Sequence, residues 1–321
     1  MKSGNPSCLV IGDINIDFNI HANAYPPEGG ETNTDSADLR LGGSACSTAL
    51  VLQKLGIQTS LAANIGMDVF ANFAMKHIQS TGMDVSLIQH LPDLQTGFFM
   101  VLITPVAQRT MFGKRGANTA ALPLEELLIK VDSVDHLHVS GYNLIGDEQG
   151  AVVTKVVEYA KAKGKTVSLD PGVCASDQIK EKILKLLPFV DYFIPSQSEV
   201  ASLANDVHED DHSSFLLNKE CLALVLKQAE NGSSIVSKQN HIHAPAISIE
   251  NKIINNTTGA GDSFNAGFLY GILSGHTPEQ ALRFGNAAGY AVITSQHGIL
   301  DLINKKDLEK TILKIANNDD K

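Results

Sequence analysis

The stretch Asn255–Phe268, NNTTGAGDSFNAGF, places two glycines and an alanine directly before a carboxylate and an apolar run. After Asp262, large apolar residues recur at four-residue spacing from Phe264 to Ile272. This period predicts an amphipathic helix that begins near Gly261. The small residues then form the first turn of that helix, where unpaired backbone N–H groups point outward.

The first turn of this helix is suited to a phosphate group. The amides of Gly259, Ala260 and Gly261 favour negative charge, and glycine lets a phosphate approach the backbone without meeting a Cβ atom. A carboxylate beside such a turn can remove a proton from a hydroxyl that attacks phosphorus. Asp262 is therefore a candidate general base, although the same pattern also fits an ordinary helix cap.

Composition limits the class of protein. The chain has 321 residues, 43% of them hydrophobic, which is enough for a substantial core. Its net charge of −10 opposes non-specific binding to nucleic acid or to anionic membranes. Because it has no apolar run of about 18 residues and no signal peptide, we expect a cytoplasmic protein whose partners include neither nucleic acid nor membrane. The four cysteines, expected to be buried thiols, are Cys8, Cys46, Cys174 and Cys221.

From Asp135 onward, short strands alternate with segments of helical character. This alternation predicts an α/β fold in which a mostly parallel sheet has helices on both faces and binds ligands beyond the carboxyl ends of its strands. We expect one large domain with a small lid formed by about residues 13–41 and 96–118, the second with a hairpin turn at Pro105–Gln108. The expected strands are His136–Ser140, Thr166–Asp170, Tyr192–Pro195 and Cys221–Leu226, and the expected helices are Glu148–Lys163, Ser176–Leu187 and Ser196–Ala204.

Further motifs occur in a fixed order along the chain. Gly12-Asp-Ile-Asn-Ile-Asp17 follows the first strand, and Gly42-Gly-Ser-Ala-Cys-Ser-Thr-Ala49 opens a helix. With NTTGAGDSF, these motifs resemble those of the ribokinase-like (PfkB) carbohydrate kinases, and the resemblance covers roughly residues 8–300. The other matching segments are Gly66–Asp68, Thr96–Phe98, Arg115–Asn118, Asp170-Pro171 and Phe284–Ala288.

The resemblance implies a ribokinase-like three-layer α/β/α sandwich with a mostly parallel central sheet and a small β-sheet lid, as one kinase domain over residues 1–321. It implies phosphoryl transfer from ATP to a hydroxyl of a small sugar, such as fructose, ribose or 2-keto-3-deoxygluconate. Asp262 would be the base, with Gly259, Ala260 and Gly261 as the anion hole. The acceptor would be held by Asp13, Asn15, Asp17, Gly42, Gly43, Ser47 and Arg115, and ATP by Ser196, Lys227, Gly259, Gly261 and Asn286.

Glu199 would organise water around Mg²⁺, although Ser196-Gln-Ser-Glu199 keeps only the glutamate of the family's N-x-x-E motif. Asn256 stands where the family usually has aspartate, so dependence on K⁺ stays open. Ser47 replaces an asparagine, and Ser44 replaces the lysine of many ribokinases, which makes ribose a less secure acceptor. Asp13 and Asp17 also fit a role in capping the loop after the first strand.

Two alternatives remain open from the sequence. A nucleoside kinase of the same fold would need apolar surface under the lid, which Phe98, Phe99, Met100 or Phe112 could supply. A non-catalytic sugar-binding relative would keep the fold without turnover. A phosphorylated sugar acceptor is less favoured, because few basic residues occupy the expected substrate segments. An apolar outer face on the lid would favour a homodimer.

Overall fold

The computed structural model describes residues 5–34, 36–104, 109–172, 177–204, 208, 212–248, 257–295 and 306. Cys174, Asn256 and the expected turn Pro105–Gln108 lie outside these residues.

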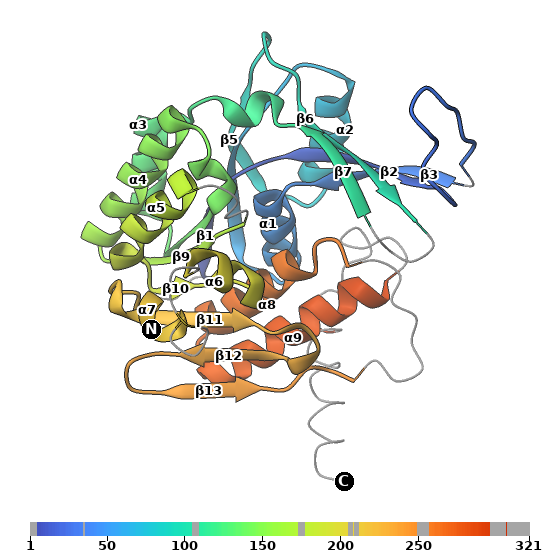
Figure 1. The fold of residues 1–321 in the computed structure, drawn as a ribbon. Helices are drawn as coiled ribbons and strands as arrows, with labels where there is room; N and C mark the ends of the chain where they lie inside the picture. Colours follow the sequence, from blue (N-terminus) through green and yellow to red (C-terminus); the bar gives the residue numbers. More distant parts are fainter. Residues whose placement is uncertain are drawn as a thin grey trace.

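A large sheet forms the centre of the molecule (Figure 1). Its strand order is β13-β12-β11-β10-β9-β8-β1-β4-β5, and the strands from β11 to β5 are parallel. The two strands at one edge, β12 and β13, are antiparallel. The strands are β1 (Ser7–Ile11), β4 (Gln58–Ile65), β5 (Asp84–His90), β8 (His136–Ser140), β9 (Thr166–Asp170), β10 (Tyr192–Phe193), β11 (Ala223–Lys227), β12 (Ser233–Val236) and β13 (His241–Ala244).

Helices cover both faces of this sheet, so the predicted α/β/α layering is confirmed (Figure 1). One apolar core lies under α1 (Ser44–Lys54), α2 (Val69–Gln79), α8 (Ala260–Leu273) and α9 (Pro278–Thr294). The other lies under α3 (Leu124–Ser133), α4 (Asp147–Ala162), α5 (Asp177–Leu186), α6 (Gln197–Leu203) and α7 (His212–Asn218). Among the described helices, none combines the length and the apolar character that crossing a membrane requires.

A second, four-stranded sheet stands beside the large one, and we call it the lid sheet (Figure 1). Its order is β3-β2-β6-β7, with β2 (Asn15–His21) parallel to β6 (Gly97–Ile103). The outer strands β3 (Ser36–Gly42) and β7 (Arg109–Lys114) pair antiparallel to these. The lid sheet is therefore built from segments that overlap both expected lid ranges, with β3 ending one residue beyond the first.

Local sequence explains the central elements. Cys8-Leu-Val-Ile11 forms β1 because a strand buried on both faces of a parallel sheet needs a continuous apolar run, and these four side chains are fully buried. The helices α8 and α9 pack closely, since a Cβ atom on Gly267 would lie 2.4 Å from the Phe284 carbonyl oxygen. This close packing fixes the start of α8 against the rest of the domain.

Two expected strands have different boundaries in the structure, and each of the three expected helices differs by one residue at both ends. The strand expected over Cys221–Leu226 is β11, Ala223–Lys227, and the strand expected over Tyr192–Pro195 is only Tyr192–Phe193. The apolar run did not reveal that the polar Lys227 continues the strand. The shift places Lys227 at the carboxyl end of β11, the edge where ligands of parallel sheets bind.

Candidate active site

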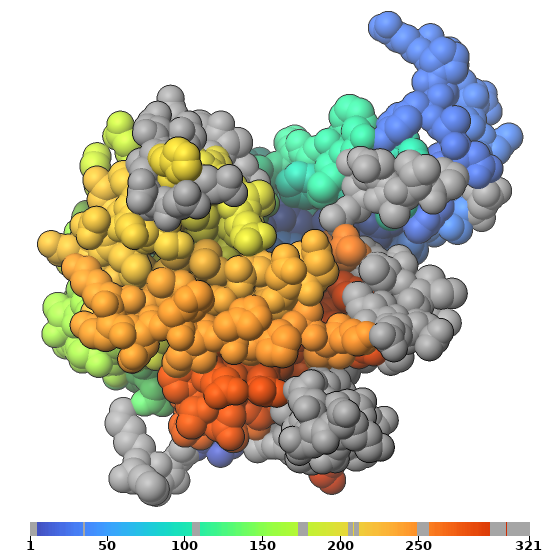
Figure 2. Space-filling view, turned by 60° about the horizontal axis from the view of Figure 1, so that its bottom comes forward, coloured from blue at the N-terminus to red at the C-terminus, as the bar shows by residue number. Residues whose placement is uncertain are grey.

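One cavity of about 1400 Å³ opens between the lid sheet and the carboxyl ends of the parallel strands. In Figure 2 the surface is hollowed between the blue and teal lid and the yellow and orange body. The structure brings every site residue expected from the sequence to the wall of this cavity. These residues are Asp13, Asn15, Asp17, Gly42, Gly43, Ser47, Arg115, Ser196, Glu199, Lys227, Gly259, Ala260, Gly261, Asp262 and Asn286.

The turn before α8 has the geometry expected of an anion-binding site. Gly259 adopts φ 79°, a left-handed conformation that glycine takes without strain, and precedes the first helical residue, Ala260. Gly261 is exposed to the cavity. The start of α8, where helix amides lack intrahelical partners, therefore borders the cavity, although Ala260 N donates to the Thr257 carbonyl oxygen at 3.3 Å.

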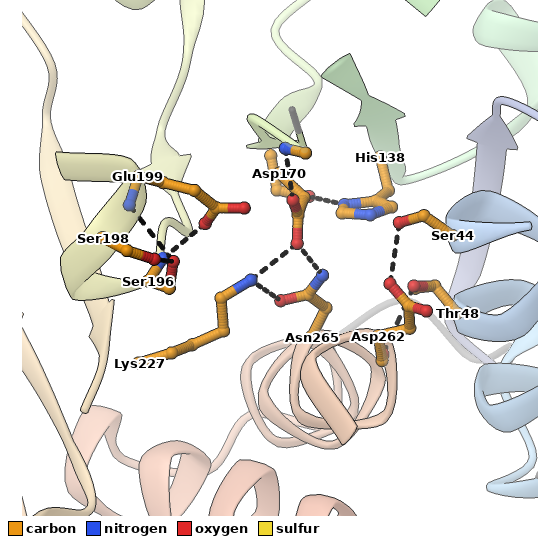
Figure 3. Close-up of polar contacts among 12 residues, drawn as sticks. Ser44, Thr48, His138, Asp170, Ser196, Ser198, Glu199, Lys227, Asp262 and Asn265 are labelled. Atoms are coloured by element: carbon orange, nitrogen blue, oxygen red, sulfur yellow. Dashed lines mark hydrogen bonds and ion pairs between the residues drawn. The ribbon is translucent and has the colours of Figure 1, made fainter. Parts of the chain in front are cut away.

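Asp262 does not cap α8. Its carboxylate oxygen Oδ1 accepts a hydrogen bond of 2.7 Å from the hydroxyl of Ser44, the first residue of α1 (Figure 3). Thr48, one turn later on α1, donates to the backbone carbonyl of Asp262 at 3.3 Å. The two helix starts are thus joined, and the carboxylate lies on the cavity wall.

The surroundings of Asp262 make it a stronger base than an ordinary aspartate. Burial disfavours the charged carboxylate, and the negative charge of Asp170 adds to this effect, so that the pKa of Asp262 rises to about 8. The hydrogen bond from Ser44 and the charge of Lys227 act in the opposite direction. A base with a pKa near the working pH is well matched to proton transfer.

A buried ion pair lies opposite the turn (Figure 3). Lys227 Nζ is 2.7 Å from Asp170 Oδ2, the carboxylate at the end of β9. Asn265 Nδ2 donates to the same oxygen, and Asn265 Oδ1 lies 3.5 Å from Nζ. Lys227 Nζ is only 3.7 Å from the position that a Cβ atom on Gly261 would take. A positive charge is therefore held beside the anion-binding turn.

Both members of this pair are charged. Burial opposes the charged form of Lys227, but the charges of Asp170 and Glu199 outweigh it and raise the lysine pKa. Burial likewise acts to raise the pKa of Asp170, but the charge of Lys227 prevails and the pKa is lowered. The ion pair thus persists at neutral pH.

Glu199 and Ser196 form the start of α6. Glu199 Oε2 accepts a hydrogen bond of 2.6 Å from the Ser196 backbone N–H, and Ser196 Oγ accepts from the Glu199 backbone N–H at 3.3 Å. This is a capping box, which fixes the glutamate at the cavity wall. Burial and the charge of Asp170 raise the pKa of Glu199.

The described residues contain no group of three or more His, Cys, Asp or Glu side chains placed to hold a metal ion. Glu199 and Asp170 would nevertheless suit Mg²⁺ bound to a nucleotide, because this ion binds through phosphates, retained waters and one or two carboxylates.

Asp13 and Asn15 are tied into the protein. Asn15 Nδ2 donates to Asp13 Oδ2 at 2.8 Å, and Ala45 N donates to Asp13 Oδ1 at 3.4 Å. Asn118 Nδ2 donates to Asn15 Oδ1 at 2.9 Å. Asp13 therefore contacts the start of α1 and also holds Asn15 in place.

Asp17 and the two glycines after β3 form the next part of the wall. A Cβ atom on Gly42 would lie 2.5 Å from Asp17 Oδ2, and one on Gly43 would lie 2.4 Å from the Asp13 carbonyl oxygen. Gly43 also has φ 96°. Both positions require glycine, because any side chain would collide with the residues expected to bind the acceptor.

The remaining expected residues are also anchored. Arg115 donates to the Tyr142 carbonyl oxygen at 3.0 Å and lies over the Tyr142 ring. Its charge opposes the effect of burial, which raises the pKa of Asp13. Asn286 donates to the backbone of Ala244 and Pro245, joining α9 to the end of β13. Ser47 is buried on α1.

The sequence did not identify every residue of the wall. Asp170 was noted only within a motif, and no role was given to Asn265, Tyr142 or Arg40, all of which contact the site or line the cavity. A signal for Asn265 existed: it follows Asp262 by three residues and so lies on the same helix face.

Comparison with known proteins identifies the family. The model of the "pfkB family carbohydrate kinase" matches residues 5–305, nearly the whole chain. The chain belongs to the pfkB family of carbohydrate kinases. It is thus a kinase of the group that acts on sugars and nucleosides, and the predicted membership is confirmed.

Relatives of this pfkB kinase align over most of its length. The ATP-dependent ribose-1-phosphate kinase of Halopiger xanaduensis is 25% identical and aligns over 88% of this chain and 90% of its own. The nucleoside kinase of Methanothermobacter thermautotrophicus is also 25% identical, over 90% and 89% of the two chains. The structure of Arabidopsis thaliana ribokinase complexed with ribose and ATP superposes with a TM-score of 0.84 at 20% identity, covering 96% of this chain and 99% of that one. The ribokinase-like fold is therefore confirmed.

Proposed function

We propose that this pfkB kinase transfers the γ-phosphoryl group of ATP to a hydroxyl of a small sugar or sugar-like molecule, with Asp262 as general base. The observation that carries the proposal is the position of the Asp262 carboxylate, at the start of α8 and on the wall of the cavity that both substrates would share. The similar structure of Arabidopsis ribokinase, which is complexed with ribose and ATP, supports this choice of substrates.

In this mechanism Asp262 takes the proton of the acceptor hydroxyl as its oxygen attacks the γ-phosphorus. The bond from phosphorus to the β,γ-bridging oxygen breaks, and ADP leaves. The amides of Gly259, Ala260 and Gly261 stabilise the charge on the transferring group. Ser44 keeps the carboxylate oriented through its hydrogen bond.

ATP would lie along the C-terminal half of the cavity, between Ser196 and Asn286, with its phosphates at the turn before α8. Lys227 would face the phosphates, since its Nζ lies beside Gly261. Mg²⁺ bound with ATP would offset phosphate charge, and Glu199 would hold water around it. Asp170 and Asn265 would position Lys227.

The acceptor would lie under the lid sheet, against Asp17 and Gly42, with Asp13, Asn15, Gly43, Ser47 and Arg115 around it. Carboxylate and carboxamide groups suit the hydroxyls of a sugar. Closure of the lid sheet over the acceptor would exclude water, which otherwise competes as a phosphoryl acceptor.

The outer face of the lid sheet supports a homodimer. Phe18, Leu39, Met100 and Phe112 are in register across the four strands and are exposed by 37%, 40%, 41% and 63%. Such an apolar stripe would be covered by the same stripe of a second copy. Sedimentation analysis of the wild type and of Phe112→Glu tests this association, which the substitution should weaken.

A screen of acceptors tests the function. The purified chain is incubated with Mg²⁺ and ATP, with and without K⁺, and ADP release is followed for fructose, ribose, 2-keto-3-deoxygluconate, adenosine and other nucleosides. We expect ADP release to depend on one sugar. ATP hydrolysis without acceptor that equals the rate with sugar would contradict the proposal, because the closed site would then fail to exclude water.

A nucleoside kinase is the second candidate. Phe99 and Met111 line the cavity next to the acceptor residues and would offer apolar surface to a base. Of the other residues considered from the sequence, Phe98 packs against the core, and Met100 and Phe112 lie on the outer face. Turnover of adenosine above that of any sugar favours this candidate. Calorimetry that detects sugar binding without turnover would instead favour a non-catalytic relative.

A further inference from the structure

Arg40 lies on the cavity-facing side of the lid sheet. It pairs with Asp17 in the register of β3 and β2, so the two side chains project from the same face. Gly42, two residues later on β3, shares this face and contacts Asp17. Arg40 and Asp17 both line the cavity. A guanidinium group is therefore part of the acceptor end of the site.

The guanidinium is oriented but incompletely bound. Its Nε donates to Asp38 Oδ2, which also accepts from Asn19 Nδ2. The Nη1 atom is buried and has no hydrogen-bond partner among the described residues. A buried donor of a charged group without an acceptor costs free energy, so a ligand oxygen that draws the guanidinium toward the cavity and pairs with this nitrogen is favoured.

The second guanidinium at this end of the cavity is already engaged. Arg115 donates to the Tyr142 carbonyl oxygen and faces the buried Asp13. Asp13 in turn holds Asn15 and the start of α1. Arg115 therefore contacts a backbone carbonyl and faces Asp13, whereas Arg40, although paired with Asp38 through Nε, has an Nη1 donor without a partner among the described residues.

The distance from the base fits a short sugar. Arg40 precedes Ser44 by four residues, and Ser44 donates to the Asp262 carboxylate at 2.7 Å. Four residues of extended chain span about 13 Å, and the chain turns at Gly43, so the Cα atoms of Arg40 and Ser44 are closer than this. This upper limit is compatible with a molecule of five or six carbons whose acidic group meets Arg40 while its hydroxyl faces Asp262.

We propose that the acceptor of this kinase is an acidic sugar, whose carboxylate or phosphate is bound by Arg40 while the hydroxyl at its other end faces Asp262. This inference rests on the proposed kinase function and specifies its substrate class. The anionic group takes no part in the transfer. It fixes which end of the sugar meets the base, and the planar guanidinium suits both oxyanions. The sequence alone disfavoured a phosphorylated acceptor because few basic residues occupy the expected substrate segments, and Arg40 was not counted among them.

The test compares two pairs of acceptors with the full chain, Mg²⁺ and ATP: ribose with ribose-1-phosphate, and fructose with 2-keto-3-deoxygluconate. The first pair tests a phosphate and the second a carboxylate. We expect the acidic member of one pair to have at least a tenfold higher kcat/KM. Arg40→Ala should lower kcat/KM for the acidic member about 10- to 100-fold and should change kcat/KM for the neutral member less than threefold. Arg40→Lys should retain part of the activity on the acidic member.

Lys114→Ala is the matched control, because Lys114 is an exposed cation on the same lid sheet and does not line the cavity. This substitution should change kcat/KM by less than twofold for both the acidic and the neutral sugar. Preference for the neutral sugars, or an equal loss on both members in Arg40→Ala, overturns the inference and leaves the kinase function intact.

If no acceptor releases ADP, the proposed function fails, and calorimetry decides the inference separately. Binding of ribose-1-phosphate or 2-keto-3-deoxygluconate to the wild type, weakened at least tenfold in Arg40→Ala, supports it. Equal affinity in the two proteins, or no binding to the wild type, overturns it.

Discussion

Lys227 Nζ lies 2.7 Å from Asp170 Oδ2, and both side chains are almost completely enclosed by the protein. The pair connects the carboxyl ends of β11 and β9 across β10. It places an ammonium group next to the turn where we propose that the phosphates bind. The same contact therefore bears on both stability and activity, and the two effects can be separated by mutation.

Lys227→Met should leave the Asp170 charge buried without its partner and lower the free energy of unfolding by about 3–5 kcal/mol. Adding Asp170→Asn removes that charge and should restore most of the stability, as urea unfolding would show. The double variant should still have at least a tenfold higher KM for ATP, because the phosphates would lose the lysine. A double variant with wild-type ATP kinetics would mean that the pair serves only the fold.

The pH dependence of kcat/KM should report Asp262. Because burial and Asp170 raise its pKa to about 8, kcat/KM should rise about tenfold per pH unit below that value and level off above it. Ser44→Ala removes a hydrogen bond that lowers this pKa, so the midpoint should move to higher pH. A profile that is flat between pH 6 and 9 would contradict the assignment.

Gly42→Ala tests the acceptor end of the cavity. The new Cβ atom would lie 2.5 Å from Asp17 Oδ2 and must displace that carboxylate. We expect KM for the acceptor to rise tenfold or more, with KM for ATP changed less than twofold. Gly150→Ala in α4 is the control, since its Cβ atom meets no atom closer than 3.4 Å. An equal rise in KM for the acceptor and in KM for ATP would indicate a general disturbance of the fold.

Asp262→Asn should have a higher free energy of unfolding than the wild type, and this difference should grow as pH rises. The pKa of Asp262 is higher in the folded chain than its ordinary value of 3.8, so its favourable contribution to folding is present below pH 4 and is lost as pH rises to about 8. Asparagine carries no charge to bury. Thermal unfolding should show the variant to be more stable than the wild type by at least about 1 kcal/mol at pH 8, with a smaller difference at pH 5. The opposite trend would mean that Asp262 is not held in a charge-disfavouring site.

Local sequence was enough to predict the anion-binding turn. The spacing of Gly259, Gly261 and Asp262 before an apolar repeat is a property of one helix, and the structure places the start of α8 within one residue of expectation. The alternation of strands and helices likewise predicted the parallel sheet. Whether Asp262 was a cap stayed open from the sequence, because only the fold brings Ser44 of α1 to its carboxylate.

Contacts between distant strands could not be predicted in the same way. The pairing of Asp170 with Lys227 depends on the order β9-β10-β11, which no local pattern contains. For Arg40 a signal was present and was not used: in Asp38-Leu-Arg-Leu-Gly42, polar residues and glycine alternate with leucine. Strand alternation places Arg40 on the same face as Gly42. Applying this alternation to the expected lid segment 13–41 would therefore have placed Arg40 at the site.

The most direct test of the account is the turnover of Asp262→Asn with the preferred acceptor at saturating ATP. The variant keeps an oxygen to accept from Ser44 but cannot take a proton, so kcat should fall roughly 100-fold or more while the protein stays folded. Undiminished kcat in a variant that binds ATP and acceptor normally would show that Asp262 is not the base and would contradict the proposed mechanism.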